Sequence, residues 1–157
     1  MPFLETCLGK MLTTFLIAMV PVVELRGAVP YGIAQGLSPW LSCGVAIAGN
    51  LVPVPFIILL SRRIFDWLRR GSFFGPKIEA LERHAHLKGQ MVRRYRLPGL
   101  ILLVGIPLPG TGAWTGALVA TVLDLRLREA LPAIFAGLLI AGGLTTALSC
   151  GVFAALR

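Results

Sequence analysis

Charged residues are scarce in this 157-residue sequence: they make up 14% of it, whereas 56% of the residues are hydrophobic and the mean hydropathy is +0.81. A soluble domain of this length could not cover so much apolar surface with so few polar groups. The shortage therefore argues against a soluble domain and predicts that lipid surrounds much of the chain. The 18 glycines and 11 prolines predict breaks inside the membrane segments, where neighbouring groups can satisfy the freed backbone.

Cysteine is also sparse, and the patterns that mark metal or catalytic sites are missing. Cys7, Cys43 and Cys150 are far apart in apolar surroundings, which argues against a disulfide framework or a CxxC metal site and favours small packing residues. His84 and His86 would point to opposite faces of a helix, with no third ligand nearby. Without a nucleophile and base pair, a Walker A motif or a GxGxxG motif, we predict no metal, no cofactor, no enzyme and no ATP-driven transport. An enzyme that acts on lipid headgroups is the weakest hypothesis.

Positive charge is concentrated in one stretch, since ten of the fifteen Lys and Arg lie between Arg62 and Arg96, against three acidic residues. Such an excess between apolar blocks predicts a cytoplasmic segment, residues 61–97, held against anionic headgroups at an inner membrane. A nucleic-acid interface is not indicated, because the basic residues do not share a face of a soluble fold with aromatic ones. Within the segment, Pro76 is placed to begin an amphipathic helix that lies on the cytoplasmic surface.

Two of the four apolar blocks, 38–60 and 130–156, contain no charge and meet the ~20 residues that a helix needs to cross the hydrocarbon core. Both are predicted to be spanning helices. Pro53 and Pro55 should interrupt the first of them near its cytoplasmic end.

The other two apolar blocks, 11–36 and 98–125, are broken at their centres. The first stops at Pro21, and the second runs into the Pro- and Gly-rich stretch 107–112. A helix of ten residues reaches only ~15 Å, half of the ~30 Å hydrocarbon core. Each block is therefore predicted to be either a re-entrant hairpin of two half-helices or a broken span.

The topology depends on that choice. We expect a single all-α membrane domain, 1–157, made of two repeats, 1–60 and 98–157, on either side of the basic segment. If the broken blocks are re-entrant, each repeat crosses the membrane once, the repeats are inverted and both termini lie outside. If they span, the repeats are parallel and both termini lie inside.

Glu24 and Arg26 are the strongest single functional signal, because ionisable groups at membrane depth usually face a protein interior or an aqueous cavity. In a regular helix, a spacing of two would point them apart, whereas extended backbone would put them on one side. We therefore expect Pro21 and Gly27 to unwind the chain so that both charges line one cavity. An interfacial loop or a structural ion pair is the alternative.

The second break carries no charge, but its backbone amides and the N-terminal end of the half-helix that follows suit a phosphate or carboxylate. Trp114 is interpreted as a lid or as a packing aromatic, and Asn50 is expected to bond the broken backbone of a neighbouring segment. The residues expected at the substrate- or proton-binding site are Glu24, Arg26, Gly27, Pro30, Asn50, Pro107, Pro109, Gly110, Thr111, Gly112, Trp114 and Thr115.

The stretches PVVELRGAVP (21–30) and PLPGTGAWTGA (107–117), with GNLVPVP (49–55) between them, resemble the small multidrug export protein family over nearly the whole chain. More remotely, the layout is similar to DedA-type membrane proteins, in which two re-entrant hairpins face each other with acidic and arginine residues and which are linked to lipid-carrier translocation. The resemblance favours the re-entrant, inverted arrangement. Here the second hairpin lacks the arginines of that group, so Arg26 alone would serve both Glu24 and a phosphate.

The leading hypothesis is a multi-pass secondary transporter that exports a small molecule or a lipid phosphate, with protonation of Glu24 altering its pairing with Arg26. The alternative is a non-transporting protein that binds lipid headgroups or a partner chain through its basic segment. A homodimer is expected in either case, because four short membrane segments enclose little volume.

Overall fold

The computed structural model describes residues 6–70, 89–106 and 111–155, and all the regular structure in these ranges is helical. The all-α prediction is confirmed. The helices are α2 (Cys7–Met19), α3 (Glu24–Ala34), α4 (Pro39–Leu51), α5 (Pro53–Arg70), α7 (Gly89–Gly105), α8 (Ala113–Val122) and α9 (Leu127–Ala155).

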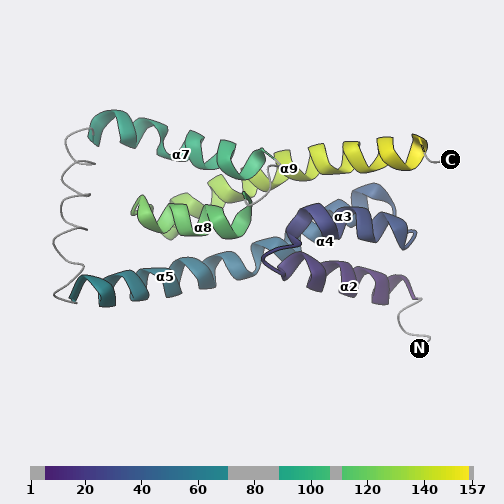
Figure 1. The fold of residues 1–157 in the computed structure, drawn as a ribbon, viewed down its shortest axis with the longest axis horizontal. Coiled ribbons are helices and arrows are strands. Elements are labelled where there is room, and N and C mark those ends of the chain that lie inside the picture. Colours follow the sequence, from purple (N-terminus) through teal and green to yellow (C-terminus); the bar gives the residue numbers. More distant parts are fainter. Residues whose placement is uncertain (1–5, 71–88, 107–110, 156–157) are drawn as a thin grey trace.

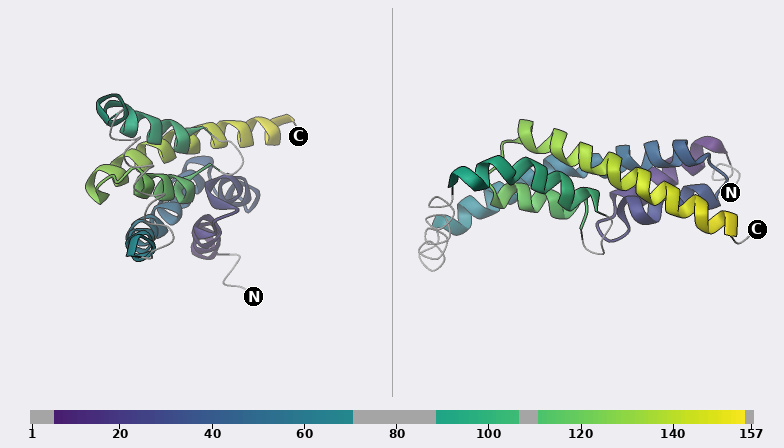
Figure 2. Two further views of the ribbon diagram at one scale, coloured as in Figure 1. Left: turned by 60° about the vertical axis from the view of Figure 1, so that its left-hand side comes forward. Right: turned by 90° about the horizontal axis from the view of Figure 1, so that it is seen from above.

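Two long elements run the length of the molecule in opposite directions: α4 followed by α5, and α9 (Figures 1 and 2). Within them, Pro39–Ile64 and Leu127–Ala155 are long and apolar enough to cross a membrane, as expected for the two spans. The helical hydrogen bonding is interrupted at Val52, because Pro53 and Pro55 have no N–H to donate. The backbone of Val52 keeps right-handed helical angles (φ −57°, ψ −49°), so α5 continues from α4.

Two short hairpins, α2–α3 and α7–α8, lie along these long elements. In Figure 1 the first enters from the end where α9 finishes and the second from the end where α5 finishes, and their tips meet near the middle. By helix rise, the 11 residues of α3 and the 10 of α8 are each ~15–17 Å long, about half of a hydrocarbon core. Both breaks therefore occur where the sequence predicts them.

The hairpins pack on both long elements. Helices α2 and α3 pack on α4, and α7 packs on α9, while α3 also contacts α9 and α8 contacts α5. Small residues allow this close approach: a side chain on Gly32 would collide with Oγ of Ser42, and one on Gly49 with the carbonyl oxygen of Phe15. The Ser42 hydroxyl donates to the carbonyl of Val29 at 2.9 Å, which ties α4 to α3.

The helices extend beyond the apolar blocks that predicted them. Helix α5 continues to Arg70 and α7 begins at Gly89, so the ends of the basic segment 61–97 belong to the long helix and the second hairpin. The apolar blocks mark only the hydrophobic part of each helix, whereas the helical hydrogen bonds continue into the basic residues. The predicted surface helix after Pro76, with His84 and His86, lies outside the described residues.

The three cysteines are free thiols. Cys43 is buried where α4 meets α9. A Cβ atom added at Gly142 would lie 2.9 Å from its Sγ, so the thiol packs closely on α9, as expected of a small packing residue. Cys7 is exposed and Cys150 is partly exposed.

Candidate functional site

The tip of the first hairpin is a tight turn of four residues, Val20–Val23, between α2 and α3. The amide of Glu24 donates to the carbonyl of Val20 at 2.9 Å, and the amide of Gly27 donates to that of Val23 at 3.0 Å. Glu24 itself has φ +48°, a left-handed conformation that costs a non-glycine residue ~1–2 kcal/mol. The turn thus ends on a strained residue whose side chain carries a charge.

The Glu24 carboxylate lies at the N-terminus of α8, in the other half of the chain. Its Oε1 accepts a hydrogen bond from the amide of Trp114 at 3.3 Å, and only 7% of the residue is exposed. Gly112, at the N-cap position of α8, has no side chain that could cap the helix. A carboxylate in this place satisfies a free amide and complements the positive end of the helix dipole.

The close approach of the Glu24 carboxylate leaves no room for a side chain at position 112, so a glycine is required there. A Cβ atom at this position would lie 2.6 Å from Cδ of Glu24 and would collide with its Oε2. The carboxylate therefore sits directly against the backbone of the second hairpin tip.

The Arg26 guanidinium binds the other side of the same tip. Its NH2 donates to the carbonyl of Thr111 and, at 2.8 Å, to the Thr111 hydroxyl, and it lies 3.5 Å from the carbonyl of Ile106. The Thr111 hydroxyl in turn donates to that Ile106 carbonyl at 2.9 Å. Because Ile106 directly follows the last residue of α7, the cation lies at the negative end of that helix.

The first hairpin thus supplies a carboxylate to the start of α8 and a guanidinium to the end of α7. The start of α8, where the sequence predicts an anion-binding end, is occupied in this structure by the protein's own Glu24 carboxylate. Sequence reasoning missed Ile106 because its contribution is a backbone carbonyl, which no residue type reveals.

The expected geometry around the two charges is wrong in two respects. Gly27 and Pro30 are not in an unwound stretch but inside α3, together with Arg26, because the turn already closes before Glu24. No ion pair joins Glu24 to Arg26 in the described structure, since each binds backbone of the second hairpin instead. The left-handed backbone of Glu24 redirects its side chain, which makes the spacing-of-two argument inapplicable.

Asn50 also differs from its prediction. It is 1% exposed, near the C-terminal end of α4, and neither Oδ1 nor Nδ2 has a hydrogen-bond partner, so it does not bond a broken backbone. The indole Nε1 of Trp114 is also buried and has no hydrogen-bond partner. Buried polar groups without partners are rare, and each calls for an explanation such as a ligand or water.

The remaining expected site residues belong to the second tip. Thr111 binds Arg26, Gly112 lies under the Glu24 carboxylate, and Trp114 and Thr115 lie in the first turn of α8. Pro107, Pro109 and Gly110 lie outside the described residues.

A second polar region lies at the end of the molecule where α5 finishes. There the Arg62 NH2 donates to the carbonyl of Leu125, in the connector between α8 and α9. The connector is thereby fixed against α5, beside the basic segment.

In a comparison with protein families, the model of the family described as "Putative small multi-drug export protein" matches residues 24–144. The matched region begins at Glu24, directly after the turn of the first hairpin, and includes α3, the second hairpin and most of both long elements. No curated protein and no solved structure matches the chain.

Proposed function

The chain belongs to the small multidrug export protein family, and from this premise we propose that it is a secondary transporter that moves a small molecule or a lipid phosphate past the tips of two re-entrant hairpins. One observation carries the proposal: Glu24 and Arg26 of the first hairpin hold the two helix ends at the tip of the second. Charged groups at bilayer depth usually mark a pathway for a substrate or ion.

The arrangement of the hairpins supports a re-entrant, inverted topology. Each hairpin starts and finishes at the same end of the molecule, and the two use opposite ends (Figure 1). The bond from Arg62 to Leu125 keeps the connector after α8 at the basic end, where a fully spanning second hairpin would not leave it. Packing is also reciprocal, since α3 contacts the long element of the second repeat and α8 that of the first.

Exposed aromatic residues support a membrane position for the long elements. Trp40, near the start of α4, and Trp67, near the end of α5, both project into the surroundings. Their 27-residue separation corresponds to ~40 Å of helix, close to the thickness of a bilayer with its headgroup regions. Such aromatics occur typically at the two membrane interfaces.

The distribution of positive charge supports an inner-membrane protein with the α5 end in the cytoplasm. Arg62 and Arg63 on α5 and Arg96 on α7 lie at that end, as do Arg126 in the connector and Arg128 in the first turn of α9. At the opposite end Lys10 is the basic residue in the described part of the chain. This asymmetry follows the positive-inside rule.

Protonation of Glu24 is the proposed coupling step, acting on α8 instead of on an ion pair with Arg26. A neutral carboxyl would complement the α8 dipole less well and accept the Trp114 amide more weakly. The tips could then separate, leaving Arg26 to bind an anionic group of the substrate. Asn50 and the Trp114 indole, which have no partners in this conformation, offer further polar contacts.

The test is transport in proteoliposomes with an imposed pH gradient, with ethidium and a fluorescent phosphatidate as separate probes. We expect the gradient to drive movement of at least one probe, and Glu24→Gln to remove the dependence on the gradient. The matched control is Arg63→Gln, which changes an exposed charge far from the tips. Gradient-driven transport by Glu24→Gln at the unchanged rate would contradict the coupling role.

A non-transporting lipid-binding or scaffold protein is the second candidate, favoured by the basic end of the molecule. Charge reversal at Arg93, Arg94 and Arg96 should then abolish binding to anionic vesicles and leave any transport intact. Association into a homodimer stays a prediction of the sequence.

A further inference from the structure

Two cavities lie in succession along the seam between α7 and α9, away from the hairpin tips. The first, of about 430 Å³, lies at the basic end and is lined by Arg96, Leu97, Asp124, Leu125, Arg126 and Glu129. The second, of about 350 Å³, is an apolar groove lined by Pro98, Ile101, Leu102, Gly105, Ile106, Ile140 and Leu144. Both volumes are within the range of small-molecule sites.

The two cavities follow one another because α7 and α9 run side by side in the same direction (Figures 1 and 2). The charged cavity ends on α7 at Leu97, and the groove begins at the next residue, Pro98. From Arg96 to Ile106 the helix rises ~15 Å. A charged pocket is thus followed by an apolar groove along the same helix pair.

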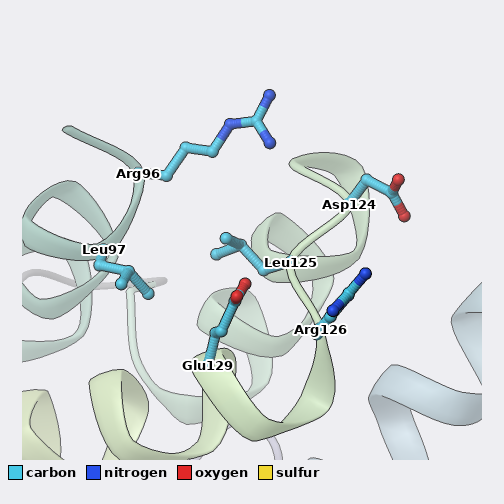
Figure 3. Close-up of a pocket in the computed structure, with 6 residues that line it drawn as sticks. All are labelled: Arg96, Leu97, Asp124, Leu125, Arg126 and Glu129. Atoms are coloured by element: carbon cyan, nitrogen blue, oxygen red, sulfur yellow. The ribbon is translucent and has the colours of Figure 1, made fainter. Parts of the chain in front are cut away.

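The charged cavity contains cationic and anionic side chains that are not paired with one another. Figure 3 shows the Glu129 carboxylate between Leu97 and Leu125, with Arg96 above them and Asp124 and Arg126 on the connector. None of the four charged side chains forms an ion pair in the described structure, and the buried Nε of Arg96 has no hydrogen-bond partner. Two cationic and two anionic side chains give this lining no net charge.

We propose that this seam binds one phospholipid with a zwitterionic, primary-amine headgroup, whose phosphate contacts Arg96, whose ammonium contacts Glu129 and whose acyl chain lies in the groove. A lining of balanced charge suits a ligand that carries both signs better than a purely anionic one. An ammonium group donates hydrogen bonds to carboxylates, which a quaternary choline group cannot. Tyr95, next to Arg96 and exposed, is of the type found at headgroup depth.

This proposal goes beyond the proposed function, because lipid binding at the seam does not depend on transport and is tested separately from it. The experiment is native mass spectrometry of the full-length protein in detergent, mixed in turn with palmitoyl-oleoyl phosphatidylethanolamine, phosphatidylcholine and phosphatidylglycerol. We expect one phosphatidylethanolamine per chain, bound about tenfold more tightly than the other two, as one charge-assisted hydrogen bond provides. Free phosphoethanolamine, which has no acyl chain, should not bind measurably.

Two variants separate the contributions of the headgroup. Arg96→Gln should weaken all three lipids about tenfold, whereas Glu129→Gln should lower phosphatidylethanolamine to the level of phosphatidylglycerol and leave the latter unchanged. Arg63→Gln, an exposed arginine on α5 that lines neither cavity, is the matched control and should behave as the wild type. Arg96→Lys, which keeps the charge, should retain most of the binding.

The groove has its own test. Leu144→Trp should fill the trough and reduce binding of all three lipids without changing their order. Equal retention of the three lipids by the wild type, or unchanged retention by Arg96→Gln and Glu129→Gln, would mean annular lipid only and would overturn the proposal.

Discussion

The start of α3 is hydrogen-bonded to the turn that precedes it, whereas the described ends of α7 and α8 are bonded by side chains of the first hairpin. In the first, the amides of Glu24 and Gly27 bond carbonyls of the turn itself. In the second, the N-cap residue of α8, Gly112, has no capping side chain, and the carbonyl after α7 accepts hydrogen bonds from Thr111 and Arg26. The two hairpins are therefore similar in shape but differ in where their hydrogen-bond partners come from.

This asymmetry teaches that Glu24 and Arg26 complete the structure of the opposite hairpin before any substrate binds. Inside a bilayer no water is available to bond the free N–H and C=O groups of a helix end, so leaving such a group unpaired costs several kcal/mol. If the proposed transport occurs, these contacts must exchange for substrate or proton. Substitutions at the two tips should therefore differ in how much they lower the free energy of unfolding and in whether they also change transport.

The largest effect should come from Gly112→Ala. The new methyl group would expel the Glu24 carboxylate and remove the cap of α8, so we expect a loss of about 3 kcal/mol in the free energy of unfolding. The measurement is SDS-induced unfolding in mixed micelles. Gly44→Ala, in an exposed helical position with open space around it, is the control and should not destabilise. Equal stabilities for the two variants would show that the close contact is absent.

Arg26→Gln should have the next largest effect. Loss of the guanidinium leaves carbonyls of Thr111 and Ile106 without their charged donor and Glu24 without a nearby cation, for which we expect a loss of about 2 kcal/mol. The same unfolding measurement checks it, with Arg63→Gln as the exposed counterpart. A result within error of that counterpart would remove Arg26 from the tip.

Glu24→Gln should lower stability by only about 1 kcal/mol. Its amide oxygen can still accept from the Trp114 amide, and only the interaction of the negative charge with the α8 dipole is lost. Stability and transport should therefore separate in this variant, with a small change in unfolding and a lost dependence of transport on the pH gradient. If unfolding suffers as much as in Gly112→Ala, the charge matters mainly to the fold.

Asn50→Leu should change stability least and in the opposite direction. Replacing a buried amide that has no hydrogen-bond partner with an apolar side chain should stabilise the protein by up to about 1 kcal/mol. If Asn50 contacts substrate, the same variant should transport more slowly. A destabilised Asn50→Leu would mean that the amide has a partner.

The sequence predicts the helical fold, the two long elements and both breaks, because these follow from hydropathy and from prolines, which act locally. It also identifies Glu24 and Arg26 as interior charges. It does not predict their partners, which are mostly backbone atoms 80 to 90 residues away whose positions depend on how the hairpins meet. Nor could it foresee that a single left-handed residue would turn the Glu24 side chain away from Arg26.

The most direct test of opposed, re-entrant hairpins is the sidedness of residue 124. In a background with Cys7, Cys43 and Cys150 replaced by alanine, Asp124→Cys, Arg63→Cys and Gln35→Cys are each labelled in intact cells with a membrane-impermeant maleimide. All three positions are exposed in the structure. Asp124→Cys should be protected together with Arg63→Cys, while Gln35→Cys is labelled. Labelling of Asp124→Cys from outside together with Gln35→Cys would show that the second hairpin crosses the membrane and would contradict the account.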